Sequence, residues 1–385
     1  MSDVSALAAG LVGGLAGRAS TYDVEGSFPA EDFAELRAAG LLGLMVPTAL
    51  GGLGASFGDY VRVAFELGRG NGATALIFNM HASVTGALAT IPEEMARALG
   101  ATDAFFAHRD DVLTRAAGGA LYVVAMSERG AGARLSQVTT TYEREGDGWR
   151  IRGEKTFCSG AGHGDAYLVA ARSGDKVSQF LVPAGPGVEV VPTWDALGMR
   201  ATGSHDVRLD VHTGHEALLG GVEGLAVLLA QAMPQWLVAS YAAVYVGVAQ
   251  SAIDAATAYL ADREQLRRLP AVRARLGRAD AQVAAARLAA EHAGRLVDTE
   301  PATPATNRWV YRAKLLAGET AMEVAASMLE ACGTGATRRG QSLERIYRDA
   351  RCGSLQPATS DVCADWLGLA VQGLDPESSA EVPRW

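Results

Sequence analysis

The sequence predicts an α+β protein of several domains, in which helical segments flank a central β domain. The spacing of apolar residues is helical up to about residue 118, alternates from about residue 120 to residue 213, and is helical again from Val222. Glycine, proline and aspartate separate the short alternating runs, as strands joined by turns require. A chain of 385 residues is also too long for one simple core. We therefore predict domains at residues 1–118, 119–221 and 222–375, with a tail at 376–385.

The first third of the chain predicts helices only. Residues 6–16 are apolar but lack the basic start of an export signal and follow Asp3, so we predict a helix or a frayed arm there. The other helices predicted in this third cover residues 28–38, 59–68, 73–90, 92–99 and 104–116. His81 lies within one of them and is interpreted as a core histidine with satisfied nitrogens rather than as a ligand.

The middle third predicts a compact β-barrel or sandwich. The alternating runs that predict its strands cover residues 121–126, 137–144, 149–152, 166–171, 178–182, 188–192 and 206–211. Gly153 is expected to break the third strand, and an extended run resumes at residues 155–157. A corner of small residues follows at 158–162, where a flat ligand can lie against backbone N–H groups.

The last third predicts a bundle of helices. The predicted helices cover residues 239–260, 271–297, 307–332 and 360–371. Two prolines in the stretch 301–304 mark a clear break between the second and the third of these helices. The last dozen residues are expected to form a loose acidic tail.

Composition limits the classes of partner. The net charge of −9 argues against nucleic acid or an anionic membrane surface, because nothing would neutralise phosphate. The four cysteines are scattered without metal-ligand spacing and are typical of a reducing cytoplasm. We expect no run long and apolar enough to span a bilayer. The cysteine usage leads us to expect a cytoplasmic protein.

Four stretches occur in an order that resembles the acyl-CoA dehydrogenase superfamily of flavoproteins. They are residues 122–132 (YVVAMSERGAG), 149–162 (WRIRGEKTFCSGAG), 194–204 (WDALGMRATGS) and 343–351 (LERIYRDAR). The resemblance extends from about Phe28 to Gly368. It implies an N-terminal helical domain, a central β-barrel or sandwich and a C-terminal four-helix bundle, with FAD as cofactor and FMN as the alternative.

The resemblance also implies which residues hold the flavin ring. Met126 and Ser127 match positions whose backbone and hydroxyl groups bond the pyrimidine side. Phe157 replaces the usual tryptophan beside the ring, and Ser159 replaces a threonine that bonds near N5, the atom whose electronics such contacts set. The alternative interpretation is that these are strand-end serines that satisfy their own backbone.

The pyrophosphate of the cofactor is expected to lie against a neighbouring subunit. Arg263 matches the family arginine that reaches it, and a guanidinium forks well onto phosphate oxygens. Gly333 and Gly335 partly match the glycine loop that approaches the same phosphate, and Thr359 matches a threonine near the cofactor. Ala133 replaces a serine that usually helps to bind the pyrophosphate. The resemblance thus implies a homo-oligomer, a tetramer or a dimer.

The catalytic base of acyl-CoA dehydrogenases is missing from both places where the family carries it. The commonest position is Pro357 here, and the region of the other arrangement, residues 235–238, has no acid. Proline also lacks the backbone N–H that holds the thioester carbonyl in the family, and such donors are worth orders of magnitude in rate. Asp361 or Asp365 could serve from a shifted loop, although both read as acids on a helix surface. No catalytic residue is therefore assigned.

Several functions remain open. Oxidation of an acyl thioester on CoA or on a carrier protein is the first interpretation. A flavin reductase or an electron acceptor is the expected protein partner. The alternative is a flavin monooxygenase of the same superfamily, which needs no such base, although Gly353 and Gln356 replace histidines found in some of those enzymes. A flavin-binding protein without activity is the third. His205 is the only histidine considered as an acid or base, and His163 is placed at the entrance of the site; a structural or exposed position is favoured for both.

Overall fold

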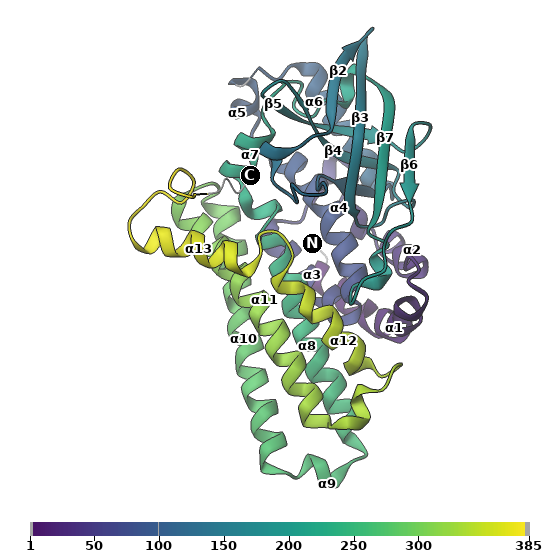
Figure 1. Ribbon diagram of the computed structural model, residues 1–385, viewed down its shortest axis with the longest axis vertical. Helices are drawn as coiled ribbons and strands as arrows, with labels where there is room; N and C mark the ends of the chain where they lie inside the picture. The colour runs from purple at the N-terminus through teal and green to yellow at the C-terminus, as the bar shows by residue number, and fades with distance from the viewer. Residues whose placement is uncertain (1–2, 99, 382–385) are drawn as a thin grey trace.

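The computed structural model describes residues 3–98 and 100–381 and confirms the helical, β and helical order (Figure 1). The β sheet lies at one end of the molecule, and the long C-terminal helices extend away from it. The first domain consists of the helices α1 (Val4–Glu25), α2 (Ala30–Ala38), α3 (Phe57–Gly70), α4 (Gly72–Thr90), α5 (Glu93–Ala98) and α6 (Asp103–Ala117). Leu99, where one predicted helix ends, lies outside the described residues.

The apolar N-terminal stretch is a complete helix rather than a frayed arm. The Asp3 carboxylate caps α1 by accepting a hydrogen bond from the backbone N–H of Ser5 at 3.0 Å. Gly26 ends the helix in the left-handed conformation, with φ of 64°. Leu15, on the inner face of α1, is fully buried, so the helix is part of the core.

His81 is a buried structural histidine, which confirms the interpretation of the sequence. Its Nδ1 accepts a hydrogen bond from the backbone N–H of Tyr122 at 3.0 Å. Its Nε2 lies 2.7 Å from the carbonyl oxygen of Leu42 and donates to it in the neutral ring. The ring thus ties α4 to the first strand and to the turn after α2. Burial lowers the pKa of His81 to about 4.

Acidification should remove the stability that neutral His81 supplies. Because the unfolded chain binds this proton at a pKa of about 6.5, the contribution is complete above that pH and is lost as the pH falls towards 4. The loss amounts to about 3 kcal/mol. Urea titrations at several pH values should show this slope in the wild type and a shallower one in His81→Gln. Equal slopes would contradict the assignment.

The middle domain is one curled, mixed sheet of seven strands in the order β1-β4-β2-β3-β7-β6, with β5 paired to β4. The strands are β1 (Tyr122–Ala125), β2 (Thr141–Glu145), β3 (Gly148–Cys158), β4 (Ala166–Ser173), β5 (Lys176–Pro183), β6 (Val188–Val191) and β7 (His205–Gly214). β1 and β4 are parallel, whereas β3 and β7 pair antiparallel along almost their whole length. The seven predicted strands are all present.

The predicted break at Gly153 is wrong. β3 continues through it, and a side chain there would lie 2.3 Å from the Thr140 hydroxyl oxygen, so glycine is needed for packing. The irregularity comes later, where the pairing with β7 shifts register between Lys155 and Cys158. Phe157 lies in this bulge with φ of 58°. The bulge turns the chain into the small-residue corner.

The C-terminal domain is the predicted helical bundle. Its helices are α7 (Ala226–Ala232), α8 (Ala239–Ala261), α9 (Glu264–Arg267), α10 (Pro270–Thr299), α11 (Pro304–Cys332), α12 (Ser342–Arg351) and α13 (Ser360–Val371). α8, α10 and α11 pack along one another, and α12 and α13 pack against α11 (Figure 1). The described part of the tail is not loose, because the Glu377 carboxylate accepts a hydrogen bond from the Trp366 indole at 2.9 Å.

One helical stretch in the described chain is long and apolar enough to cross a membrane, contrary to the expectation from sequence. It covers Pro234–Ala261 and includes α8. Its most apolar window is 83% buried inside the fold. The apolar composition therefore matches its place between other helices of the bundle.

Candidate functional site

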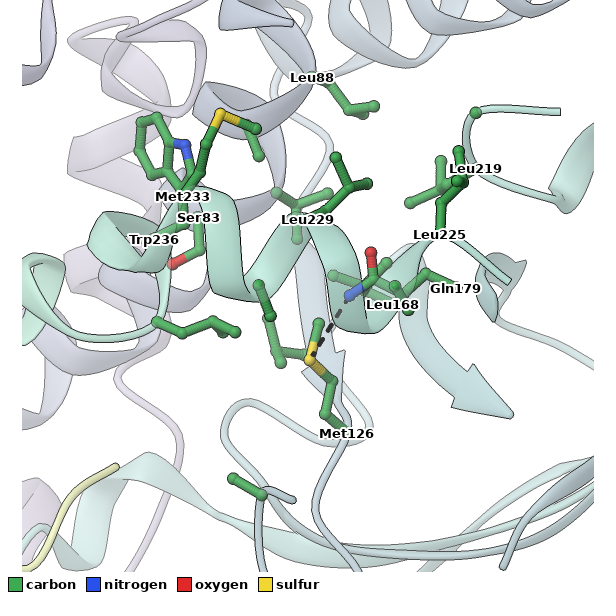
Figure 2. Close-up of a pocket in the computed structure, with 18 of the residues that line it drawn as sticks. Ser83, Leu88, Met126, Leu168, Gln179, Leu219, Leu225, Leu229, Met233 and Trp236 are labelled. Carbon is green, nitrogen blue, oxygen red and sulfur yellow. Dashed lines mark hydrogen bonds between the residues drawn. The ribbon is translucent and has the colours of Figure 1, made fainter. Parts of the chain in front are cut away.

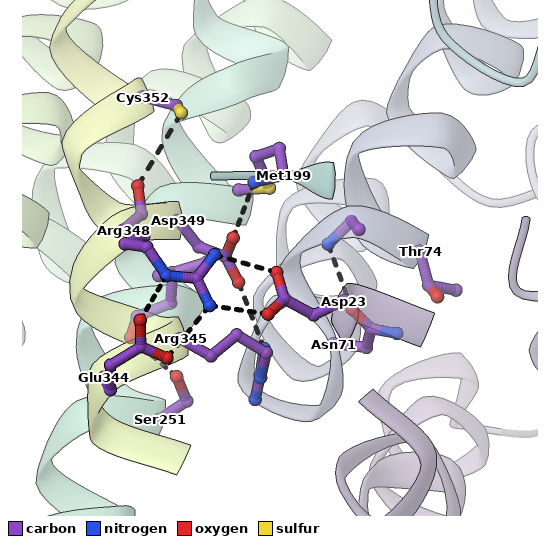
Figure 3. Close-up of polar contacts among 12 residues, drawn as sticks. Asp23, Asn71, Thr74, Met199, Ser251, Glu344, Arg345, Arg348, Asp349 and Cys352 are labelled. Atoms are coloured by element: carbon purple, nitrogen blue, oxygen red, sulfur yellow. Dashed lines mark hydrogen bonds and ion pairs between the residues drawn. The ribbon is translucent and has the colours of Figure 1, made fainter. Parts of the chain in front are cut away.

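Two of the four sequence motifs, residues 194–204 and 343–351, form hydrogen bonds and ion pairs with each other and with α1 (Figure 3). The guanidinium of Arg348, on α12, donates to the Asp23 carboxylate and, at 3.0 Å, to the Leu197 carbonyl. The neighbouring Asp349 accepts a hydrogen bond from the backbone N–H of Met199 at 2.6 Å. A side chain at Gly198 would lie 2.2 Å from the carbonyl oxygen of Arg348. These motifs fasten the three domains together behind the small-residue corner.

The loop after β1 is held by a buried ion pair. The Lys155 ammonium lies 2.7 Å from the Glu128 carboxylate, and both side chains are almost completely buried. The carboxylate also accepts hydrogen bonds from the backbone N–H groups of Thr139, at 2.6 Å, and of Thr140, at 3.0 Å. Burial alone would raise the pKa of Glu128, but the bonds from Lys155 and Thr139 lower it to about 2. The pair is charged at neutral pH.

This loop and the bulge of β3 bring together the residues predicted to hold a flavin ring. The backbone N–H of Thr156 donates to the carbonyl of Ser127 at 2.9 Å, which places Ser127 beside Phe157. The Phe157 ring is 61% exposed, and its centroid lies 6.0 Å from that of Trp194, edge to face. Met126 is buried one residue before Ser127. An exposed aromatic face therefore adjoins polar backbone.

The Ser159 hydroxyl belongs to a chain of hydroxyl groups. Its Oγ lies 2.9 Å from Oγ of Ser204, which in turn lies 2.6 Å from Oγ1 of Thr202. Thr202 Oγ1 donates to the carbonyl of Met199 at 2.8 Å. Ser159 is therefore paired with a side chain rather than with its own backbone. The chain of hydroxyl groups runs from the corner back to the motif cluster around Arg348.

The two histidines near this corner have structural contacts. Nδ1 of His205 accepts hydrogen bonds from the backbone N–H groups of Thr193 and Trp194, at 3.1 and 3.0 Å. Burial lowers the pKa of His205, which favours this neutral acceptor. His163 is exposed and stacks on Phe28 with 4.0 Å between ring centroids. His205 thus holds the segment that carries Trp194.

A cavity of about 160 Å³ opens beside Met126 and Ser127 (Figure 2). α4 and strands β1, β4 and β5 form its walls, and α7 lies across it with Leu229 and Met233 among the lining side chains. Pro357 and Tyr241 also line it. Among the described residues, no acid, base or histidine lines this cavity. Its polar groups are hydroxyls, the Gln179 amide and the Trp236 indole.

The residues predicted to bind pyrophosphate gather at the far end of α8. The guanidinium of Arg263 lies 3.7 Å from the centroid of the Tyr259 ring and donates to the Tyr259 carbonyl. A side chain at Gly335 would lie 2.5 Å from the Tyr259 hydroxyl oxygen, whereas one at Gly333 would meet open space. No described carboxylate lies within 4.0 Å of Arg263. The end of the bundle thus presents a cation with free donors beside a glycine turn.

Family models for three domains match consecutive stretches of the chain. The N-terminal domain of acyl-CoA dehydrogenases matches residues 13–98, the middle domain residues 123–211 and the C-terminal domain residues 230–365. The chain belongs to the acyl-CoA dehydrogenase family. The resemblance seen in the sequence is confirmed, and so is the flavin expected with it, FAD with FMN as the alternative.

Relatives of this acyl-CoA dehydrogenase family member are named for more than one activity. It is 31% identical to the putative acyl-CoA dehydrogenase YdbM of Bacillus subtilis, over 89% of this chain and 90% of the relative. It is 30% identical to the L-evernosamine nitrososynthase of a Micromonospora species, over 97% of this chain and 90% of the relative. The structure of KijD3 with FMN and a dTDP-amino-keto-sugar has a TM-score of 0.82 at 25% identity, covering 97% of this chain and 95% of KijD3.

The resemblance in sequence places the family base at position 357, which is a proline here. Pro357 lines the cavity at that position. Asp361 and Asp365 are exposed on α13 and do not line the cavity. This agrees with their interpretation from sequence as acids on a helix surface. The Thr359 hydroxyl caps α13 by accepting from the backbone N–H of Val362 at 3.3 Å. The described cavity therefore offers no carboxylate as a proton acceptor.

The sequence did not indicate three groups near the cavity: the Lys155–Glu128 pair, Tyr241 and Lys314. Tyr241 and Lys314 stand within apolar helical patterns, where an aromatic or a long side chain reads as packing. Glu128 is within a matched motif, but its partner comes from another strand. Only the pairing of β3 beside the loop after β1 could have indicated that contact.

Proposed function

We propose that the chain is a flavin-dependent oxidoreductase whose ring site consists of Met126, Ser127, Phe157 and Ser159. The support is their assembly around the bulge of β3, where an exposed aromatic ring adjoins the loop after β1. These residues would bind and orient the isoalloxazine of FAD, or of FMN. The flavin would supply the redox chemistry, and the chain would supply its position and the exclusion of water from the apolar cavity.

The phosphate end of the site requires a second copy of the chain. α8 has 23 residues and spans about 33 Å, with the cavity at its start and Arg263 beyond its end. One chain therefore does not bring both groups to one cofactor. Arg263, Gly333 and Gly335 would instead serve a neighbour's flavin in a homo-oligomer, a tetramer or a dimer, and Thr359 would lie near the cofactor.

Flavin retention tests this assignment. Ser159→Ala and Arg263→Gln should each weaken flavin binding by about tenfold or more, because each removes a hydrogen bond to a polar or charged group of the cofactor. Flavin content after gel filtration and the dissociation constant measured by fluorescence give the readout. Ser173→Ala and Arg268→Gln are the matched controls. Full occupancy in both site variants would show that the assignment is wrong.

For the reaction, we propose oxygenation of a small, largely apolar substrate. The observation that carries it is the uncharged cavity. Pro357 lines it, and the resemblance would put the family base and its N–H at this position, where proline supplies neither. α,β-Dehydrogenation needs a group that takes the α-proton, and the described lining has none. The nitrososynthase relative, which spans nearly the whole chain, agrees with oxidative chemistry of this other kind.

Oxidation of an acyl thioester is the second candidate. The observation in its favour is the 31% identity to a putative acyl-CoA dehydrogenase over 89% of the chain. It requires a base that lies outside the described cavity lining, or one that moves into it.

One pair of measurements separates the two reactions. The flavin-loaded protein is first titrated without oxygen with acyl-CoA thioesters of short to medium chain length. It is then supplied with oxygen, NADH and a flavin reductase in the presence of small aromatic substrates. We expect no bleaching in the first step and a product carrying one oxygen atom from O₂ in the second. Bleaching with formation of an enoyl thioester would establish the dehydrogenase. If neither product forms, the chain is a flavin-binding partner without activity.

A further inference from the structure

Lys314 is a buried cation held by neutral groups just behind the cavity. Its side chain, on α11, is fully buried. The ammonium donates to the carbonyls of Gly353 at 2.9 Å and of Gln356 at 3.2 Å, and its nitrogen lies 6.0 Å from the centroid of the Tyr241 ring. Two carbonyls and one ring face therefore surround its three donors. In the described chain, no carboxylate lies within 4.0 Å of it.

The choice of lysine at this place is specific to the site. Only three of the chain's 34 basic residues are lysines, and two of these, Lys155 and Lys314, are fully buried. A compact ammonium fits between two carbonyl oxygens where a planar guanidinium would not. Lys314 donates to the carbonyl of Gln356, which precedes Pro357, and lies over the ring of Tyr241. It therefore contacts two parts of the cavity wall at once.

Tyr241 is the cavity residue through which this charge can act. Its hydroxyl donates to the sulfur of Met80 at 3.6 Å, and both residues line the cavity. A thioether is a weak acceptor, so an oxygen atom of a bound molecule would replace it readily. Burial raises the pKa of Tyr241 well above its ordinary value, so the hydroxyl keeps its proton and acts as a donor.

We infer that Tyr241, backed by the positioning residue Lys314, is the oxyanion donor of this cavity. Its ligand would be a small, otherwise apolar molecule with one oxygen atom that bears or develops negative charge, such as a phenolate or an enolate. The hydroxyl would do the work of the N–H that Pro357 lacks. The inference rests on the proposed function, because it assigns the substrate class of the same cavity.

The groups that face Lys314 leave its charge uncompensated. Tyr241 and Tyr245, on α8, are neutral because burial raises the pKa of both. Cys363, on α13, is a further titratable neighbour in the described chain. Burial lowers the pKa of Lys314 to about 8, so the charge is present below that pH and fades above it.

Ionisation of bound 4-nitrophenol tests the inference. The flavin-loaded protein is titrated with the probe from pH 5 to pH 8, and the absorbance of the bound phenolate gives its pKa in the cavity. Tyr241→Phe and Lys314→Met should each weaken the acidity of the bound probe by about tenfold, the effect of a lost donor or of a unit charge nearby. Tyr245→Phe, one helical turn away and outside the cavity lining, and the exposed Lys176→Met should behave like the wild type.

The outcomes separate the inference from the proposed function. Equal probe acidity in the wild type, Tyr241→Phe and Tyr245→Phe would overturn the inference, and this comparison stands even if Lys314→Met does not fold. A wild type that keeps its flavin but binds no probe would overturn it as well. A protein that binds the probe with the expected shifts but retains no flavin would support the oxyanion site and contradict the proposed flavin function.

Discussion

Replacement of Arg348 by methionine should lower the free energy of unfolding by about 3–5 kcal/mol. The guanidinium forms a bidentate pair with Asp23 and a second pair with Glu344, and the side chains of Arg348 and Asp23 are only 8% and 9% exposed. Without Arg348, two acids would remain close together with little access to water. Because Asp23 is on α1 and Arg348 on α12, the loss falls on the contact between the two helical domains.

Urea denaturation of the wild type, Arg348→Met, a double variant and a surface control measures this effect. The double variant Arg348→Met with Asp23→Leu should recover much of the loss, because it removes the buried Asp23 charge and leaves Glu344, which still lies 3.7 Å from the Arg339 guanidinium. Arg339→Met is the matched control, since that side chain is 80% exposed and should change stability by no more than about 0.5 kcal/mol. A loss of the same size in Arg339→Met, or none in Arg348→Met, would rule out the role assigned to the pair.

Replacement of Lys155 by methionine should have an effect of similar size, about 3–5 kcal/mol, together with weaker flavin binding. The Glu128 carboxylate would stay charged and buried, with the backbone N–H groups of Thr139 and Thr140 and the Thr139 hydroxyl as its remaining partners. The loop that carries Met126 and Ser127 depends on this pair, so the ring site should loosen with it. Lys176→Met, on the surface, should change neither property.

The double variant Lys155→Met with Glu128→Leu distinguishes the charge from the packing, because it should regain stability but not flavin affinity. The acid dependence gives a further check. Since the pKa of Glu128 in the fold is about 2, its contribution is complete above about pH 4.5 and is lost only as the pH falls towards 2. A wild type whose stability at this loop is already lost at pH 5 would contradict the pairing.

Much of the fold followed from local patterns. The period of two between apolar residues predicted all seven strands, and the helical period predicted α3, α4, α8, α10 and α11 within a few residues. The arrangement as one curled sheet did not follow, because strand pairing joins segments far apart in the chain. The break assigned to Gly153 failed for the same reason. Its neighbour Thr140 and the register with β7 decide where β3 bends.

Some residues of the candidate site could likewise be proposed from local motifs, and others could not. The proposed ring residues follow from short motifs that resemble those of the family, and the hydrogen bond from the Thr156 N–H to the Ser127 carbonyl places Ser127 beside Phe157. Tyr241 and Lys314 could not be predicted, because a buried tyrosine in an apolar helix has the same pattern whether it faces a core or a cavity. The partner carbonyls of Lys314 lie 39 and 42 residues away in the sequence.

The sequence by itself determined the family, the order of helical and β domains, and the absence of a carboxylate at position 357 and in residues 235–238. Periodicity and residue identity encode these properties locally. Only the tertiary structure decided that Pro357 and Tyr241 face one uncharged cavity and that Arg263 lies at the opposite end of α8 from it. The physical reason is that burial and charge at a site depend on which distant segments pack together, and local sequence patterns do not specify these long-range contacts.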